Sequence, residues 1–199
     1  QMCIRDSYTD KPSQVLPIVI HGDAAVAGQG IVYEVMQMER LKGYTTHGTI
    51  HLVINNQIGF TTNPSDSRST TYCTDIAKGF QAPVLHVNSD DTEAVVRAFL
   101  FALDYRMTFG TDVFIDVIGY RKYGHNEGDE PRFTQPSLYK LIGTHKNPTV
   151  IYTEKLVNQG VITPKEIEAY EENYRNHLDT ELEASRLKDL TIINPFMQN

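Results

Sequence analysis

The chain has 199 residues, of which 40% are hydrophobic and 22% are charged, and its formal net charge is -7 at pH 7. This size and composition suit one large soluble domain, or one domain with an appendage. No apolar run approaches the roughly 18 to 20 residues that cross a bilayer, and no basic cluster offsets the acidic balance, which argues against membranes and nucleic acids as partners. Two cysteines without CxxC spacing exclude a disulfide framework and favour a reducing, cytosolic type of compartment.

The two ends of the sequence differ from its interior. The opening "QMCIRDS" has no pattern, and "MCIRDS" resembles the translation of a transposon-end sequencing adapter, so we expect residues 1–7 to be non-native. The last stretch, "LTIINPFMQN", stops on apolar residues without a helix cap or a polar tail. We therefore expect an internal fragment of a longer protein, with one domain over residues 8–162 and a peripheral helix and the start of a linker over residues 163–199.

Apolar, β-rich runs alternate with helical patterns along the first 120 residues. Helices are expected over about 27–41 and 92–107, and the strands are expected at "VLPIVI", "TIHLVI", "APVLHV" and "DVFIDVIGY". This alternation is typical of an α/β fold in which helices cover both faces of a parallel sheet. Because the strands are nearly all apolar, they favour burial on both faces.

The pattern changes after Tyr120. A polar loop, "RKYGHNEGDEPRFTQP", leads into helical segments near 135–144, 149–159 and 164–185. The last segment has Pro164 in its first turn and a charged face, so it is expected to be a peripheral amphipathic helix.

Polar residues follow the first two expected strands at the point where each strand ends. "HGDAAVAGQG" places Asp23 after the first strand, and "NNQIGF" places Asn55 and Asn56 after the second. Ligands of parallel α/β sheets collect outside the carboxyl ends of the strands. A carboxylate, an amide oxygen and a free loop carbonyl are hard ligands suited to Mg²⁺, with substrate phosphates completing the shell. Alternatively, Asp23 caps its helix, the glycines permit close helix packing, and the asparagines form a turn.

Together, "GDA", a spacer of 30 residues and "NN" resemble the fingerprint of thiamin-diphosphate enzymes, usually written as GDG, a slightly shorter spacer and NN. Ala24 stands here in place of the last glycine. The words "HGDAAVAGQG", "INNQIGFTT", "YCTDIAKGFQAPVLHVNSDD" and "YRKYGHNEGDEP" are similar to the first-component family of 2-oxoglutarate dehydrogenases, the decarboxylating subunits of 2-oxo acid dehydrogenase complexes. The resemblance covers about residues 15–162 and implies the diphosphate-binding domain of the thiamin-diphosphate fold.

The resemblance assigns cofactor and metal contacts residue by residue. It implies that Asp23, the Asn56 side chain and the Ile58 carbonyl bind Mg²⁺, with diphosphate oxygens and a water completing the shell. It also implies that Gln57 and Gly59 shape the loop that turns the Ile58 carbonyl inward. Small residues would let the backbone approach the diphosphate closely: Gly22, Ala24 and Ala25.

The second predicted site is the loop "YGHNEGDEP", which follows the strand "DVFIDVI" at the same sheet edge. The resemblance assigns His125 to the active centre, as a donor that stabilises the anion formed on a substrate ketone or as a proton carrier. The alternative is an exposed loop histidine without such a role. Four polar neighbours are expected to fix this loop rather than to do chemistry: Asn126, Glu127, Asp129 and Glu130.

Several other polar residues have structural interpretations. His47 and His51 lack metal-ligand spacing with a third ligand and are expected to be packing or surface histidines. Cys73 has no adjacent base that would mark it as a nucleophile. Asp75 is expected to anchor the loop that precedes it, and Arg68 to face the substrate or the diphosphate.

The reaction implied by the resemblance is oxidative decarboxylation of 2-oxoglutarate in the tricarboxylic acid cycle. It uses thiamin diphosphate and transfers succinyl to the lipoyl domain of the dihydrolipoyl succinyltransferase component. A homodimer is implied, in the bacterial cytoplasm or, in a eukaryote, the mitochondrial matrix. The family's cofactor-activating glutamate and distal-carboxylate pocket fall outside this sequence, so we expect the isolated chain to be inactive. The alternatives are a non-oxidative 2-oxoglutarate decarboxylase or carboligase, a relative acting on a longer 2-oxo acid, and a non-catalytic α/β module.

Overall fold

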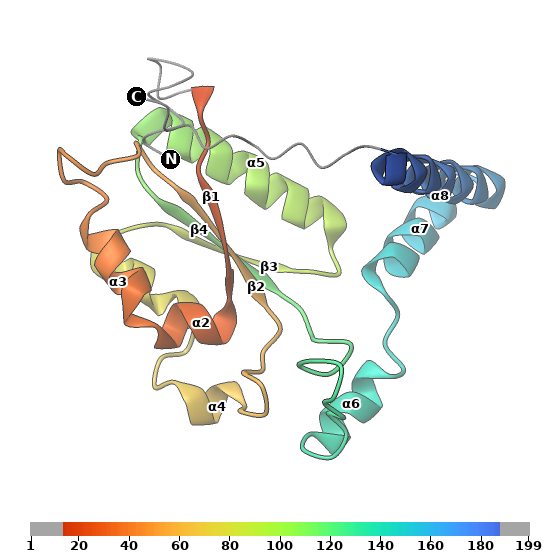
Figure 1. Ribbon diagram of the computed structural model, residues 1–199, viewed down its shortest axis with the longest axis horizontal. Coiled ribbons are helices and arrows are strands. Elements are labelled where there is room, and N and C mark those ends of the chain that lie inside the picture. The colour runs from red at the N-terminus through yellow and green to blue at the C-terminus, as the bar shows by residue number, and fades with distance from the viewer. Residues whose placement is uncertain (1–13, 188–199) are drawn as a thin grey trace. The chain divides into compact units, whose positions relative to one another are not determined.

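The computed structural model describes residues 14–187 and contains a four-stranded sheet in which every neighbouring pair of strands is parallel. The strand order is β1-β2-β4-β3 (Figure 1). The strands span Ile18–Gly22 (β1), Ile50–Asn55 (β2), Val84–Asn88 (β3) and Val113–Ile118 (β4). All four expected strands form, and their carboxyl ends meet at one edge of the sheet.

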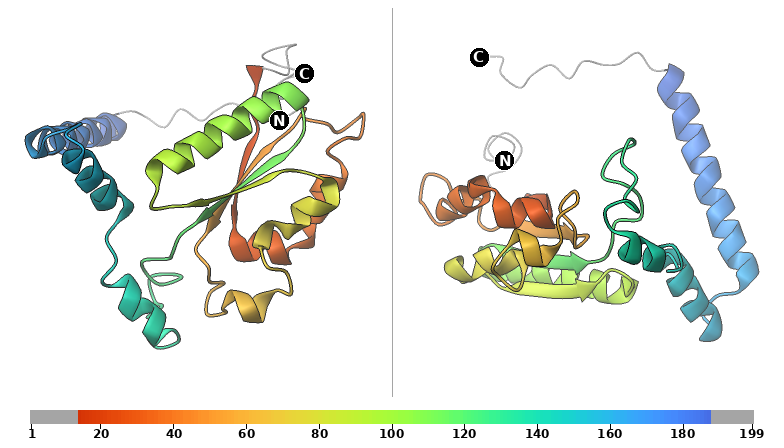
Figure 2. Two further views of the ribbon diagram at one scale, coloured as in Figure 1. Left: turned by 180° about the vertical axis from the view of Figure 1, so that it is seen from behind. Right: turned by 90° about the horizontal axis from the view of Figure 1, so that it is seen from below.

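Helices cover both faces of this sheet. The helices α2 (Asp23–Gly28) and α3 (Gly30–Gln37) pack with the 3₁₀ helix η2 (Cys73–Phe80) on one face. The long helix α5 (Thr92–Phe109) crosses the other face, as the view from behind shows (Figure 2). The predicted α/β fold with a doubly covered parallel sheet is confirmed.

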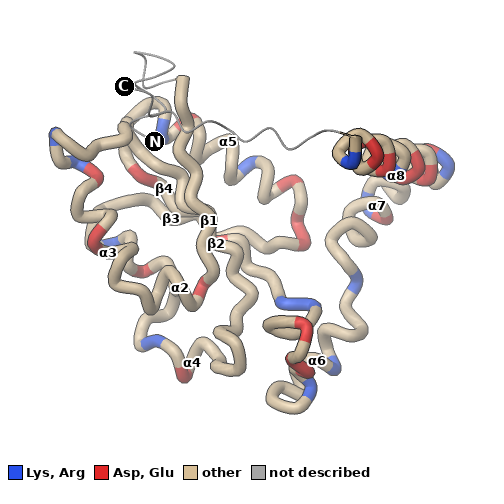
Figure 3. The backbone as a smooth tube through the Cα atoms, viewed as in Figure 1, with Lys and Arg blue, Asp and Glu red and all other residues tan. Residues whose placement is uncertain are grey.

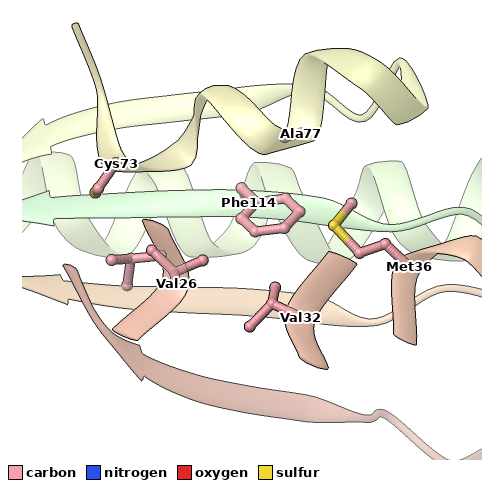
Figure 4. Packing of buried hydrophobic residues seen from close by; sticks show 7 residues of the cluster. Val26, Val32, Met36, Cys73, Ala77 and Phe114 are labelled. Carbon is pink, nitrogen blue, oxygen red and sulfur yellow. The ribbon is translucent and has the colours of Figure 1, made fainter. Parts of the chain in front are cut away.

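Strand β4 supplies side chains to the hydrophobic cores on both faces. Successive residues of a strand point to opposite faces, so Phe114 enters one core while Val113 and Ile115 enter the other. The core under α2, α3 and η2 is shown in Figure 4 and consists of Val26, Val32, Met36, Val53, Cys73, Ala77 and Phe114. The core under α5 consists of Ile50, Val87, Ala102, Val113 and Ile115.

The helix expected over 27–41 begins earlier and is interrupted. It begins at Asp23, directly after β1, and leaves helical geometry at Gln29, where φ is -104° and ψ is 115°. A glycine stands on each side of Gln29, and glycine is unfavourable in a helix interior. The result is two short helices in place of one, of which the second ends at Gln37.

Strand β1 corrects the expectation that the apolar strands are buried on both faces. Ile18, Val19 and Ile20 are 41%, 38% and 67% exposed, whereas Phe114 and Ile115 in β4 are fully buried. Within residues 14–187, β1 pairs with β2 alone and is therefore an outermost strand of the sheet. An apolar run thus predicts a strand without predicting how many neighbours it has.

The segment between β2 and β3 contains short helices where a loop was expected. Helix α4 spans Pro64–Ser67, and η2 follows it. Asp75 anchors the start of η2 as expected, because its Oδ2 accepts the N–H of Tyr72 at 3.0 Å and its Oδ1 lies 2.6 Å from Lys78 Nζ.

The chain divides into two compact units, residues 1–148 and 149–199. Helix α6 (Pro136–Ile142) belongs to the first unit, whereas α7 (Pro148–Asn158) begins at the boundary and α8 (Pro164–Leu187) lies in the second. The three helices expected after residue 120 form as α6, α7 and α8. Residues of both charges occur along α8 (Figure 3).

The ends of the chain and the domain bounds are untested. Residues 1–7, expected to be non-native, lie outside the described residues, as does the end of the segment 163–199. The domain bounds at 8–162 and 163–199 stay predictions. No helix among residues 14–187 is long and apolar enough to cross a membrane.

Candidate functional site

The carboxyl ends of β1 and β2 bring Asp23 against the loop that follows β2. The two strands pair in register as far as Gly22 and Ile54, so the segments that leave them start side by side. A Cβ placed on Gly59 would lie only 2.9 Å from the Cβ of Ala24, closer than side-chain carbons tolerate. The loop therefore packs directly on the first turn of α2, next to the aspartate.

Asp23 is a desolvated carboxyl group at this contact. It is 3% exposed. Burial raises its pKa, and the backbone N–H groups of Asp23, Ala24 and Asn56 together with the Arg68 guanidinium oppose that rise. Burial disfavours the charged form of a carboxylate, whereas a nearby cation favours it. A divalent cation bound beside Asp23 would therefore offset the cost of its burial.

Asn55, the last residue of β2, and Asn56, which follows it, form the turn that was the alternative interpretation of their sequence. Asn56 Oδ1 accepts the N–H of Ile58 at 3.1 Å, and Gln57 adopts the left-handed conformation with φ of 62°. An amide oxygen has two lone pairs, so after this hydrogen bond Asn56 Oδ1 retains one lone pair for a second partner. The turn and a metal-ligand role are compatible.

His125 lies on an exposed loop that contacts the loop after β2. Its backbone N–H donates to Asp129 Oδ2 at 2.8 Å, and its ring centroid lies 5.0 Å from that of Phe60. The structure thus brings His125 to the loop after β2 through Phe60, and Asp129 fixes the histidine's own loop. Two further neighbours make local contacts: Asn126 Oδ1 accepts the N–H of Gly128 at 3.0 Å, and Glu130 pairs with Arg132 at 2.8 Å.

Comparison with known proteins identifies the family of this chain. Residues 8–191 match the family described as dehydrogenase E1 component. The chain belongs to the dehydrogenase E1 component family. This confirms the resemblance seen in the sequence.

The most similar relatives include 2-oxoglutarate dehydrogenase E1 components from several bacteria. The protein of Haemophilus influenzae is 54% identical over 168 residues, which cover 84% of this chain and 18% of the relative. The proteins of Brucella anthropi and Brucella ovis are each 51% identical over 174 residues, which cover 87% of this chain and 17% of each relative. The chain therefore spans less than a fifth of the length of these relatives.

Arg121 joins the two loops of this E1-family chain, although sequence analysis did not single it out. Its Nη2 donates to the carbonyl of Phe60 at 3.0 Å, and its Nε donates to the Tyr139 hydroxyl at 3.0 Å. Nη2 also lies 3.8 Å from Asp129 Oδ2. The sequence signal for Arg121 was a basic residue three positions after the end of β4. That position lies where the carboxyl ends of the strands meet.

Arg68 and Cys73 lie near Asp23 on the segment that precedes and begins η2. The Arg68 guanidinium is close enough to lower the pKa of Asp23, and its Nη2 donates to the carbonyl of Thr71 at 3.4 Å. Burial, and then the Asp116 carboxylate, raise the pKa of the Cys73 thiol to about 12. A thiol with that pKa is not a nucleophile at neutral pH, in agreement with the interpretation from sequence.

One histidine of "HGTIHL" packs in the interior and the other lies at the surface, as expected. His51 is 3% exposed, stacks on Phe114 with ring centroids 4.4 Å apart, and lies 3.1 Å from Asp112 Oδ2 through its Nε2. His47 is exposed. Within residues 14–187, no three His, Cys, Asp or Glu side chains gather into a metal site, so a cation at Asp23 would need the amide and carbonyl oxygens of the loop.

Open space lies beside the loop after β2. A pocket of about 310 Å³ is lined by Asn56, Tyr120 and Lys122 among others. A second pocket, of about 490 Å³, is lined by Gln57, His86 and neighbouring residues. The first pocket has a mostly apolar lining, and Lys122 Nζ donates to Asn147 Oδ1 at 3.3 Å.

Proposed function

We propose that this chain is the magnesium- and diphosphate-binding part of a thiamin-diphosphate-dependent 2-oxoglutarate dehydrogenase E1 component. The observation that carries the proposal is a buried aspartate, Asp23, held against the loop that presents Asn56 and Ile58. Membership of the E1 family and the names of the relatives support the cofactor and the substrate. The same names favour the oxidative dehydrogenase over a non-oxidative enzyme or a non-catalytic module.

The Asp23 carboxylate, Asn56 Oδ1 and the Ile58 carbonyl hold Mg²⁺ in this proposal. Three protein oxygens leave the remaining octahedral positions to diphosphate oxygens and water, which is the coordination that Mg²⁺ prefers. Gly22, Ala24 and Ala25 provide the surface on which the diphosphate lies. No atom of the described residues, chain neighbours aside, lies within 4 Å of the place where a Gly22 Cβ would be, so a ligand has room there.

When bound, thiamin diphosphate would supply a nucleophilic carbon for a 2-oxo acid and a ring that serves as the electron sink for decarboxylation. His125 donates a hydrogen bond or a proton at the substrate carbonyl oxygen, where negative charge develops. Its exposed ring and its contact with Phe60 support this role. Lys122 adds positive charge to the pocket that Asn56 lines.

The rest of the activity belongs to the whole protein. In the proposal, a homodimer transfers succinyl to the lipoyl domain of the dihydrolipoyl succinyltransferase component, in the bacterial cytoplasm or a mitochondrial matrix. In the same proposal, the cofactor-activating glutamate and the distal-carboxylate pocket of the whole protein are supplied by residues other than these 199. The 199-residue chain is therefore expected to bind the diphosphate end of the cofactor without catalysis.

Calorimetric titration of thiamin diphosphate into the chain, with and without Mg²⁺, tests the proposal. Binding is expected only with Mg²⁺, is expected to be lost in Asp23→Ala, and is expected to be retained in Asp66→Ala, which removes an exposed acid of α4. Inorganic pyrophosphate is expected to compete, because the diphosphate carries the contact. Metal-independent binding, or equal binding by Asp23→Ala, would refute the assignment.

A further inference from the structure

A buried carboxylate lies beneath the loop after β2 and has no role in the function proposed above. Asp116, in the middle of β4, is 0% exposed. Its Oδ1 accepts a hydrogen bond from Asn55 Nδ2 at 3.0 Å, and its Oδ2 lies 2.8 Å from His86 Nδ1. A fully buried carboxylate is costly unless it is paired and hydrogen-bonded, so its partners are what make this position tolerable.

The hydrogen bonds around Asn55 allow one orientation of its side-chain amide. The backbone N–H of Gln57 can only donate, so the Asn55 atom 3.1 Å away from it must be the oxygen. The other amide atom is then the NH₂ group, which needs an acceptor, and an ionised Asp116 carboxylate can only accept. Gln57 and Asp116 therefore fix the same orientation from opposite ends of the side chain.

The fixed amide holds a strained part of the loop. Gln57 has φ of 62°, a left-handed conformation that is unfavourable for residues other than glycine. Two bonds hold Gln57 in this conformation: Asn55 Oδ1 accepts its N–H, and its Nε2 donates to the Gly119 carbonyl at 2.8 Å. The residues on either side of Gln57 are Asn56 and Ile58, the proposed ligands.

We propose that Asp116 is a positioning residue for the loop after β2, which carries the proposed ligands Asn56 and Ile58. By accepting the Asn55 NH₂ group it turns the Asn55 oxygen toward Gln57, and the loop then presents Asn56 Oδ1 and the Ile58 carbonyl beside Asp23. His86 supports the carboxylate from the other side, with its ring 4.0 Å from that of Tyr72. The positioning of the loop follows from the structure alone, whereas its consequence for a ligand rests on the proposed function.

Exchanging the two side chains tests this role. Asn55→Asp places two carboxylates face to face, and like charges at hydrogen-bond distance are unfavourable. Adding Asp116→Asn to Asn55→Asp restores the three bonds described above: the new amide donates to the new carboxylate, its oxygen accepts from His86 Nδ1, and the carboxylate still accepts the Gln57 N–H. Asn158→Asp, at an exposed position of α7, controls for the added charge.

The primary measurement is hydrogen exchange of the Gln57 amide by NMR, compared with amides in the middle of β2 and β4. Asn55→Asp is expected to speed exchange at Gln57 at least tenfold more than in the strands, and the double variant to return it to within about threefold of the original chain. A double variant that unfolds, or whose Gln57 amide exchanges as fast as in Asn55→Asp, would overturn the proposal. So would an Asn55→Asp variant with unchanged exchange at Gln57.

Calorimetry with Mg²⁺ and inorganic pyrophosphate gives a second, separable readout. Affinity is expected to fall at least tenfold in Asn55→Asp, to recover in the double variant, and to stay unchanged in Asn158→Asp. If the original chain binds no magnesium pyrophosphate, the proposed function fails, while the exchange measurement still decides whether Asp116 positions the loop.

Discussion

The contact between Gly59 and Ala24 makes a sharp prediction about the site. A Cβ added by Gly59→Ala would meet the Ala24 Cβ at 2.9 Å, so the loop must move away from α2. Overpacking of this kind costs about 1 to 3 kcal/mol. Ala24→Gly removes the obstructing methyl group and by itself costs about 0.5 to 1 kcal/mol, the usual loss for glycine in a helix.

The two changes together should cost little more than Ala24→Gly alone, which gives a coupling free energy of about 1 to 3 kcal/mol, close to the whole cost of Gly59→Ala. Urea unfolding of the four proteins, followed by circular dichroism, measures it. Gly28→Ala is the matched control. A Cβ added at Gly28 would meet no atom within 4 Å, so this substitution should be neutral or slightly stabilising. Additive effects of Gly59→Ala and Ala24→Gly would show that the loop does not pack on α2, and the argument for a site there would fail.

Four further predictions concern Asp23, Cys73 and the chain's own activity. Burial raises the pKa of Asp23 in the folded chain, so the folded state loses stability as the pH rises above the pKa that Asp23 has in the unfolded chain. Asp23→Asn should therefore unfold at a higher urea concentration than the original chain at pH 7 without metal. An equal or lower midpoint would contradict this. With the pKa of Cys73 raised from 9.0 to about 12, a Cys3→Ser chain should react with iodoacetamide at pH 8 roughly a thousandfold more slowly than the unfolded chain. Deprotonation of the same thiol in the unfolded state should remove about 1.4 kcal/mol of stability by pH 10, a loss absent in Cys73→Ala. Finally, the chain with thiamin diphosphate and Mg²⁺ should release no carbon dioxide from 2-oxoglutarate, and measurable release would refute the proposal that it binds the cofactor without catalysis.

The sequence predicts those parts of the fold that depend on local pattern. Hydrophobic periodicity identified the apolar runs that form β2 and β4. It also identified the long helix α5, because such patterns are typical of few other secondary structures. The break at Gln29 and the exposure of β1 were missed, because the first depends on two glycines within an otherwise helical pattern and the second on which strands pair.

The candidate site was predicted in part. Asp23, Asn56 and Ile58 follow strand ends that the alternating pattern places on one edge, so their proximity could be inferred from the fold class. The support beneath them could not, because Asn55 and Asp116 are 61 residues apart and meet only through the pairing of β2 with β4. Arg121 was missed for the same reason, since its partners lie on three separate segments.

Paramagnetic NMR with Mn²⁺ tests the central claim most directly, because Mn²⁺ accepts the same oxygen ligands as Mg²⁺ and broadens the signals of nearby nuclei. In the presence of inorganic pyrophosphate, substoichiometric Mn²⁺ should first broaden the backbone amide signals of Asp23, Asn56 and Ile58. Excess Mg²⁺ should reverse the effect, and Asp23→Ala should abolish it. Broadening that begins elsewhere in the chain, or that persists unchanged in Asp23→Ala, would contradict a metal site at the carboxyl ends of β1 and β2.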